Sequence, residues 1–157
     1  MGRKRVVLYA SRTGTTQKIA QDLANRFEAD LIKVFPQKDY GSFANAIMRV
    51  AKEKATNEQA TSGTEFCDYS DYEIIFLGFP IWAGDVPTYF QDHILNSEFG
   101  GTTIVPFATS AFSSMANSIR TIKQLCPGSR IMYPFLYNRK TANQYPGWLY
   151  KLKSFLA

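Results

Sequence analysis

Short apolar runs alternate with segments of helical periodicity along this chain of 157 residues. Continuous apolar runs of four to seven residues are typical of strands that are covered on both faces of a sheet. The pattern predicts strands at residues 6–9, 31–35, 74–79, 102–108 and 130–136. The second of these runs alternates apolar and polar side chains more than the others, and we therefore expect it to be an outer strand.

Between these runs, apolar side chains recur at spacings of three and four residues, which predicts helices. The predicted helices cover residues 16–27, 87–95, 114–125 and 145–156, and a further helix-like segment spans 43–55. Strands that alternate with helices form right-handed crossovers and a parallel sheet. The sequence therefore predicts an α/β fold with a doubly wound sheet of five parallel strands, in a single domain over residues 1–157.

Composition is consistent with a globular domain, since 45% of the residues are hydrophobic and a chain of this length buries about two-thirds of its unfolded surface. Cys67 and Cys126 match neither a redox pair nor the spacing of metal ligands, so we expect two free thiols and no metal site. The chain has no run of eighteen apolar residues that would span a membrane. The apolar run after the basic start is too short for a secretory signal, and we expect a cytoplasmic protein.

The chain carries 18 basic and 13 acidic side chains, which gives a net charge of +5. A positive charge of this size raises the question of a nucleic-acid partner. However, the basic residues are scattered along the chain at positions that helices and loops leave to solvent, and no recognition motif accompanies them. We therefore expect no nucleic-acid surface.

A segment rich in hydroxyl groups joins the first predicted strand to the first predicted helix. Backbone N–H groups at the start of a helix lack internal partners, and together with the helix dipole they attract anions. Hydroxyl groups of the segment can donate to the same anion, its glycine lets the backbone close around it, and its arginine adds a formal charge. The segment consists of Ser11, Arg12, Thr13, Gly14, Thr15 and Thr16. Two interpretations remain open at this point, a phosphate site and an ordinary helix cap.

Two further motifs lie downstream. Residues 71–84 read DYEIIFLGFPIWAG, and residues 104–110 read IVPFATS. The first resembles the pattern YDxIxxGxPxWxG, which forms the third strand and the following loop of flavodoxins, and the second resembles their fourth strand. With the start S-x-T-G-x-T, these motifs follow the order of the short bacterial branch of the flavodoxin family over nearly the whole chain. The resemblance implies a strand order of 2-1-3-4-5 and FMN as the cofactor, bound between strands one and three as in flavodoxins generally.

The resemblance also implies which residues contact FMN. The phosphate would be held by residues 11–16, the hydroxyl-rich segment described above. One side of the isoalloxazine ring and ribityl chain would be lined by Phe79, Pro80, Ile81, Trp82, Ala83 and Gly84. The other side would be lined by Thr109, Ser110, Ala111, Phe112, Ser113 and Ser114. The flavin supplies the redox chemistry, so no catalytic side chain is expected.

The last of these segments departs from the family pattern TSGGSG, because Ala111 and Phe112 stand where glycines are usual. Glycine adopts positive φ and lets the backbone approach a ligand closely, which alanine and phenylalanine do less readily. Phe112 would stack on the ring, cover its edge or partly fill the pocket. Elsewhere, we expect His93 at the surface or at a helix cap, and Trp148 with Tyr150 in the packing of the last helix.

The resemblance implies an electron carrier that shuttles electrons between redox proteins through its flavin. Flavodoxins of this kind are usually acidic, whereas this chain is basic. The charge predicts partners with acidic docking surfaces, or a flavin that is less reducing than in acidic relatives. Two alternatives remain, an FMN-dependent NAD(P)H or quinone-type reductase that acts on a small acceptor and a flavin-free interaction module. We favour the carrier over a stand-alone oxidoreductase.

Overall fold

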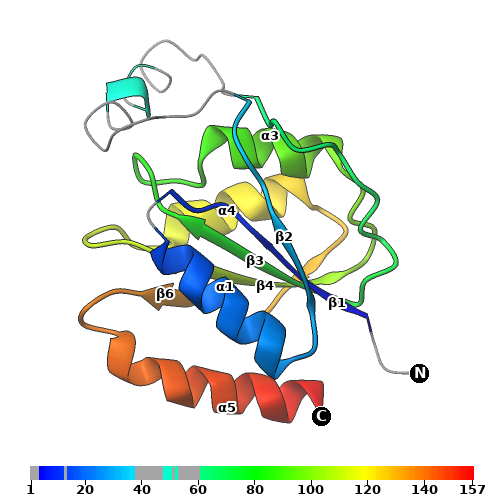
Figure 1. Cartoon of the computed structure of the whole chain (residues 1–157), viewed down its shortest axis with the longest axis vertical. Coiled ribbons are helices and arrows are strands. Elements are labelled where there is room, and N and C mark those ends of the chain that lie inside the picture. Colours follow the sequence, from blue (N-terminus) through cyan, green and yellow to red (C-terminus); the bar gives the residue numbers. More distant parts are fainter. Residues whose placement is uncertain (1–3, 13, 38–47, 51, 53–60) are drawn as a thin grey trace.

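Strands and helices alternate along the chain as the apolar pattern predicts (Figure 1). The computed structural model describes residues 4–12, 14–37, 48–50, 52 and 61–157. Its strands are β1 (Arg5–Tyr9), β2 (Asp30–Lys33), β3 (Ile74–Pro80), β4 (Thr103–Thr109), β5 (Arg130–Ile131) and β6 (Phe135–Tyr137). Its helices are α1 (Thr15–Arg26), α3 (Thr88–Asn96), α4 (Ala116–Leu125) and α5 (Tyr145–Leu156), with a short 3-10 helix at Ala142–Gln144. Of the predicted helix at 43–55, residues 48–50 and 52 are helical and the remainder lies outside the described residues.

The strands form one sheet in the order β2-β1-β3-β4-β5, which confirms the predicted order and the doubly wound α/β fold. Every strand pair is parallel, and β2 lies at one edge as its alternating pattern predicts. The carboxyl ends of β1, β3 and β4 therefore lie side by side.

The predicted strand at 130–136 is wrong in one respect, because it divides into β5 and β6, which both pair with β4. Pro134 has no N–H to give to the ladder, and Tyr133 adopts a positive φ of 51°. The positive φ of Tyr133 turns the chain out of the extended conformation, and the missing N–H of Pro134 removes a ladder donor beside it. The indole Nε1 of Trp148 donates a hydrogen bond of 2.7 Å to the carbonyl oxygen of Tyr133, which holds the interruption against α5.

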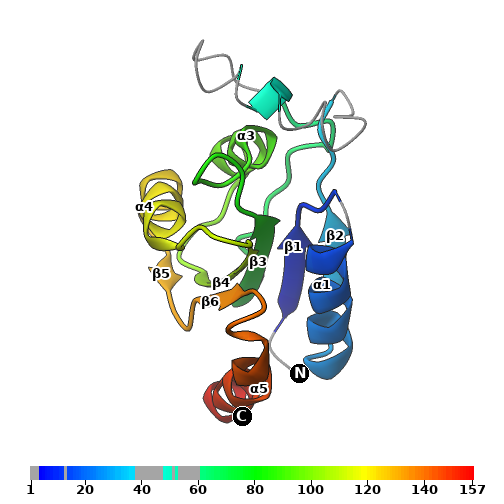
Figure 2. The ribbon, with the colours of Figure 1, turned by 90° about the vertical axis from the view of Figure 1, so that its left-hand side faces the viewer.

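Helices cover both faces of the sheet, with α1 and α5 on one face and α3 and α4 on the other (Figure 2). Successive side chains of β3 enter the two cores in turn, since Phe76 packs with the first layer and its neighbours Ile75 and Leu77 with the second. Tyr9, Phe76 and Phe107 are buried, as expected of core residues. Burial on both faces explains why the strands read as continuous apolar runs.

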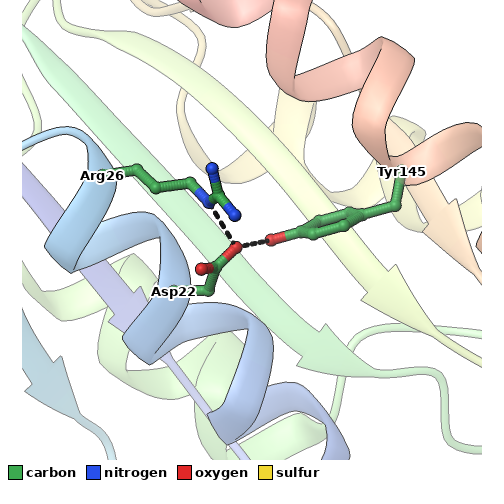
Figure 3. A network of polar contacts seen from close by, with 3 residues as sticks. All are labelled: Asp22, Arg26 and Tyr145. Atoms are coloured by element: carbon green, nitrogen blue, oxygen red, sulfur yellow. Dashed lines mark hydrogen bonds and ion pairs between the residues drawn. The ribbon is translucent and has the colours of Figure 1, made fainter.

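Polar contacts join α1 to α5 on the first face (Figure 3). Oδ2 of Asp22 accepts a hydrogen bond of 2.7 Å from the Tyr145 hydroxyl and one of 2.8 Å from Nε of Arg26. Trp148 is buried in this layer, as predicted, and stacks on Phe135. The expectation for Tyr150 is wrong, because its side chain is 74% exposed on the outer face of α5.

His93 is buried rather than at the surface, which corrects the prediction from the sequence. It lies on the inward face of α3, one helical turn after Tyr89 and Phe90, and a side chain at that spacing points in the same direction. Its Nε2 lies 2.7 Å from the hydroxyl of Tyr69, and its Nδ1 lies 3.3 Å from Oγ of Ser62. Burial lowers the pKa of His93. A backbone hydrogen bond at Thr64 and the charge of Asp92 each raise this pKa, but by less than burial lowers it.

Both cysteines are free thiols, as predicted, with Cys67 exposed and Cys126 buried. Within the part of the chain that the structure describes, no three histidine, cysteine or acidic side chains gather to hold a metal ion. In the same residues, every helix is too short or too polar to cross a lipid bilayer.

Candidate cofactor-binding site

Three loops meet at the carboxyl edge of the sheet, and together with the adjoining ends of β3, β4 and α1 they contain the residues that the sequence nominates. The first loop, residues 11–14, joins β1 to α1; the second, residues 81–85, follows β3; the third, residues 110–114, follows β4. Their strands are neighbours in the order β1-β3-β4, so the loops are neighbours too. Thr13 lies outside the described residues.

The first loop presents the uncapped start of a helix. Gly14 occupies the N-cap position of α1 with a left-handed φ of 96°, and no side chain caps the helix there. The first helical hydrogen bond runs from the N–H of Lys18 to the carbonyl of Gly14, so the preceding N–H groups of the first turn have no acceptor within the helix. Oγ of Ser11 accepts a hydrogen bond of 3.1 Å from the N–H of Gly14 and closes the loop. This geometry favours an anion at the helix start over simple side-chain capping.

The second loop is a tight two-residue turn. Trp82 and Asp85 exchange backbone hydrogen bonds of 2.9 and 3.1 Å, and the residues between them, Ala83 and Gly84, have positive φ values of 52° and 79°. Two positive φ values in succession are typical of a type I′ turn. The side chain of Trp82 is half-buried and packs on Tyr89, at 6.1 Å between ring centroids.

Helix α4 holds this turn in place. Oγ1 of Thr121 donates a hydrogen bond of 2.9 Å to Oδ2 of Asp85, whose Oδ1 accepts one of 2.7 Å from the N–H of Val86. Nδ2 of Asn117 lies 3.3 Å from the carbonyl oxygen of Gly84. The sequence analysis missed Asp85, Asn117 and Thr121. The position of Asp85 directly after the tryptophan motif was a usable signal, whereas the two α4 residues stand more than thirty positions away with no motif of their own.

The third loop is stabilised by its own serine. Oγ of Ser110 accepts hydrogen bonds from the N–H groups of Phe112 and Ser113, at 3.3 and 2.9 Å. None of residues 109–114, all of which are described, has a positive φ, so alanine and phenylalanine stand in place of the usual glycines without backbone strain. The Phe112 side chain is 100% exposed and therefore does not fill the space between the loops. Ala111 and Ser114 are also exposed.

Thr109 connects the loops. Its hydroxyl lies 2.9 Å from the hydroxyl of Thr16 in the first turn of α1, and its carbonyl accepts a hydrogen bond of 2.9 Å from the N–H of Ile81. Thr16 is buried, while Thr15 beside it is exposed. Phe79 is buried in the core behind the second loop, and Pro80 is half-buried at the end of β3. The three loops are thus held together by hydrogen bonds that meet at one residue.

The site holds few ionisable groups. Among the described residues of the three loops these are Arg12, which is half-buried, and Asp85, whose carboxylate is engaged by Thr121 and Val86. Tyr9 at the end of β1 is buried, which raises the pKa of its phenol and keeps it neutral. The arrangement offers hydrogen-bond donors and an aromatic wall, which suit a bound cofactor.

Comparison with known proteins agrees with this geometry. The family model described as flavodoxin matches residues 4–152. The chain belongs to the flavodoxin family. Membership in this family supports FMN as the cofactor expected from the sequence. No protein of curated function matches the chain.

Solved structures share the flavodoxin architecture. A candidate flavoprotein from Bacteroides eggerthii is 29% identical, with a TM-score of 0.76 over 93% of this chain and 95% of the other. One from Bacteroides uniformis is 26% identical, with a TM-score of 0.74 over 94% and 99%. A flavoprotein from Lactobacillus acidophilus, solved in complex with FMN, is 18% identical, with a TM-score of 0.67 over 92% and 99%. At this identity, the similarity to the Lactobacillus protein shows a shared fold and nothing more.

The residues of this flavodoxin family member fit FMN on structural grounds. A phosphomonoester carries about two negative charges and three strong acceptor oxygens, which match the free N–H groups at the start of α1. Gly14 already adopts its left-handed conformation, and a Cβ there would meet no atom within 4 Å, so conformation rather than space calls for glycine. The half-buried Trp82 offers an aromatic surface at the neighbouring loop.

Proposed function

We propose that residues 1–157 form a single domain that binds FMN at the carboxyl edge of the sheet and carries electrons between redox proteins. The observation that carries this proposal is the hydrogen bond between Thr16 and Thr109. It joins the uncapped start of α1, which suits a phosphate, to the strand end that leads into the third loop. FMN, when bound, supplies the capacity to take up and release electrons.

The protein's own part is to bind and orient the cofactor. The N–H groups of the first α1 turn and the hydroxyls of the first loop would hold the phosphate. Trp82 and the turn behind it would line one side of the ring, and residues 109–114 the other. Because α4 fixes the turn and Ser110 fixes the third loop, both walls are formed before the cofactor arrives.

The net charge of +5 supports partners with acidic docking surfaces. Opposite charges steer two proteins into an encounter, and this increases the association rate more than the affinity. Bound FMN, at about two negative charges, leaves the whole protein positive.

Phosphate recognition is tested by comparing FMN with riboflavin, which lacks the phosphate. We expect the apoprotein to quench FMN fluorescence at much lower concentration than riboflavin fluorescence. Ser11→Ala is expected to reduce this preference, because it removes the acceptor that closes the first loop. Ser154→Ala, at an exposed serine in α5, is the matched control and should leave the preference unchanged. Equal affinity for the two flavins, with no effect of Ser11→Ala, would refute the phosphate site.

Electron carriage is distinguished from direct reductase activity by steady-state assay. A carrier loaded with FMN should oxidise NADH and NADPH slowly in the absence of another protein, with or without a quinone. Stepwise chemical reduction followed by absorbance should show two separate one-electron stages. Sustained quinone-dependent turnover of NAD(P)H by the purified protein would overturn the electron-carrier proposal and favour a reductase.

A further inference from the structure

A rigid turn with two cations follows β6. Oδ1 of Asn138 accepts hydrogen bonds from the N–H groups of Lys140 and Thr141, at 2.8 and 3.0 Å. The N–H of Asn138 in turn donates to Oγ1 of Thr141, which itself donates to the carbonyl of Leu136, at 2.9 and 2.6 Å. These bonds hold the turn at both ends. At its tip, the side chains of Arg139 and Lys140 are exposed.

This turn lies beside the third loop of the cofactor site. Strand β6 runs parallel to β4 with Tyr137 paired to Thr109, so both strands end at the same edge of the sheet. The N–H of Ser110 lies 3.3 Å from the carbonyl oxygen of Tyr137. The first cation, Arg139, therefore stands two residues after Tyr137, which contacts the third loop.

The third loop itself presents an exposed aromatic side chain. Phe112 is 100% exposed, although an aromatic ring of this size is usually at least partly covered. The hydrogen bonds to Ser110 hold its backbone, so the ring projects from an ordered loop. Neither residues 109–114 nor residues 138–141 include an acidic side chain, so Arg139 and Lys140 are the only charged side chains of the two segments.

We infer that Phe112, Arg139 and Lys140 form a docking surface for a redox protein whose contact face is acidic around an apolar depression. This inference rests on the proposed function, since it places the partner at the cofactor's edge. Protein interfaces are typically anchored by an aromatic side chain that is buried on contact and surrounded by a polar rim. The arginine fork binds carboxylates in pairs of hydrogen bonds, and the lysine adds a point charge.

Two haem proteins of opposite charge serve as probes, the acidic soluble domain of cytochrome b5 and the basic cytochrome c. Two ferric haems accept one electron each from one fully reduced FMN, and the protons taken up on reduction return to solvent. We expect the FMN-loaded protein to reduce cytochrome b5 rapidly at low ionic strength, at a rate that falls as salt is added. Cytochrome c should react slowly at low salt and should not show this fall.

The double variant R139E/K140E is compared with K151E/K153E, which changes the net charge equally at exposed positions in α5. We expect R139E/K140E to slow cytochrome b5 reduction by at least about 10-fold at low salt, and the control to slow it much less. Phe112→Ser should slow the same reaction while its salt dependence persists. Oxidation by ferricyanide, a small anion, measures any effect of Phe112→Ser on the flavin itself, and cytochrome b5 reduction should slow by a larger factor than this reaction. Equal effects of the two double variants would overturn the assignment.

Carbodiimide cross-linking provides a readout that does not depend on electron transfer. The reagent condenses a lysine amine with a carboxylate to form an amide. The water released in this condensation converts the carbodiimide to a urea. With cytochrome b5 we expect the cross-linked peptide to contain Lys140, and we expect Lys151 and Lys153 to be recovered largely unmodified. Cross-links spread evenly over these lysines would overturn the docking surface, as would binding of duplex DNA in preference to cytochrome b5 through the same cations.

The two proposals fail in different ways. Normal FMN binding combined with equal effects of the two double variants would overturn the docking surface alone. Absence of FMN binding with cross-linking still confined to Lys140 would overturn the proposed function and would support an acidic partner for this face.

Discussion

Thr121 on α4 donates a hydrogen bond of 2.9 Å to the Asp85 carboxylate, which closes the turn after Trp82. The bond spans 36 positions of sequence and links a helix to a loop of the cofactor site. The position of this turn therefore depends on a residue that lies outside the three loops of the site.

Thr121→Val is expected to loosen the turn, because it keeps the side-chain shape and removes the donor. We expect a loss of about 1 kcal/mol in the free energy of unfolding and faster dissociation of FMN, measured by denaturant unfolding and by stopped-flow fluorescence. Thr121→Ser keeps the hydroxyl and should retain most of the slow dissociation. An unchanged FMN dissociation rate in Thr121→Val would show that the turn does not depend on α4.

Gly78→Ala should destabilise the fold. Gly78 pairs with Phe107 across β3 and β4, and a Cβ at this position would lie 2.1 Å from Cζ of the buried Phe107 ring. Overpacking of a close-packed core costs about 1–3 kcal/mol, and denaturant unfolding measures it. Gly147→Ala in α5 is the matched control, since its Cβ meets nothing within 4 Å and alanine favours a helix by about 0.5–1 kcal/mol. Equal stabilities of the two variants would contradict this packing.

Acid should destabilise the protein through His93. Burial lowers the pKa of His93 in the folded state, so the unfolded chain takes up a proton first as the pH falls. The free energy of unfolding should be highest above pH 6.5, about the pKa of His93 in the unfolded chain. It should decrease as the pH falls through this value. His93→Gln removes the titrating group, and its stability should vary less between pH 7 and pH 5. The same pH slope in both proteins would exclude His93 as the cause.

Alkali should destabilise the protein through Tyr145. Burial, followed by the hydrogen bond to Asp22, raises the pKa of Tyr145 in the folded state. The stabilisation is therefore complete below the unfolded pKa of about 10 and is lost as the pH rises above it. Tyr145→Phe is expected to lose about 1 kcal/mol at neutral pH and to show a shallower decline at high pH, measured by urea unfolding. Tyr150→Phe, on the exposed face of the same helix, should behave like the unchanged protein.

Much of the fold followed from local patterns. Continuous apolar runs predicted the strands because each strand is covered by helices on two faces, and the flavodoxin resemblance supplied their order. The same patterns misplaced His93, since an imidazole reads as polar although α3 turns it inward beside Phe90. They also missed the break at Tyr133, where a positive φ occurs beside a tertiary hydrogen bond from Trp148 that no local pattern reveals.

For the site, the sequence nominated three loops, and the structure brings those loops to one edge of the sheet. It did not indicate how the loops are held. The contacts of Asn117 and Thr121 with the second loop are long-range and involve residue types that are common on helix surfaces. The roles of the individual loop residues toward FMN remain predictions for the experiments above.

The interruption between β5 and β6 changes what one border of the sheet can offer to another chain. An outer strand normally exposes a row of unpaired N–H and C=O groups, onto which another chain can add. Here one border of the sheet consists of two short strands of two and three residues, separated by residues 132–134. Such a border offers no continuous template for aggregation.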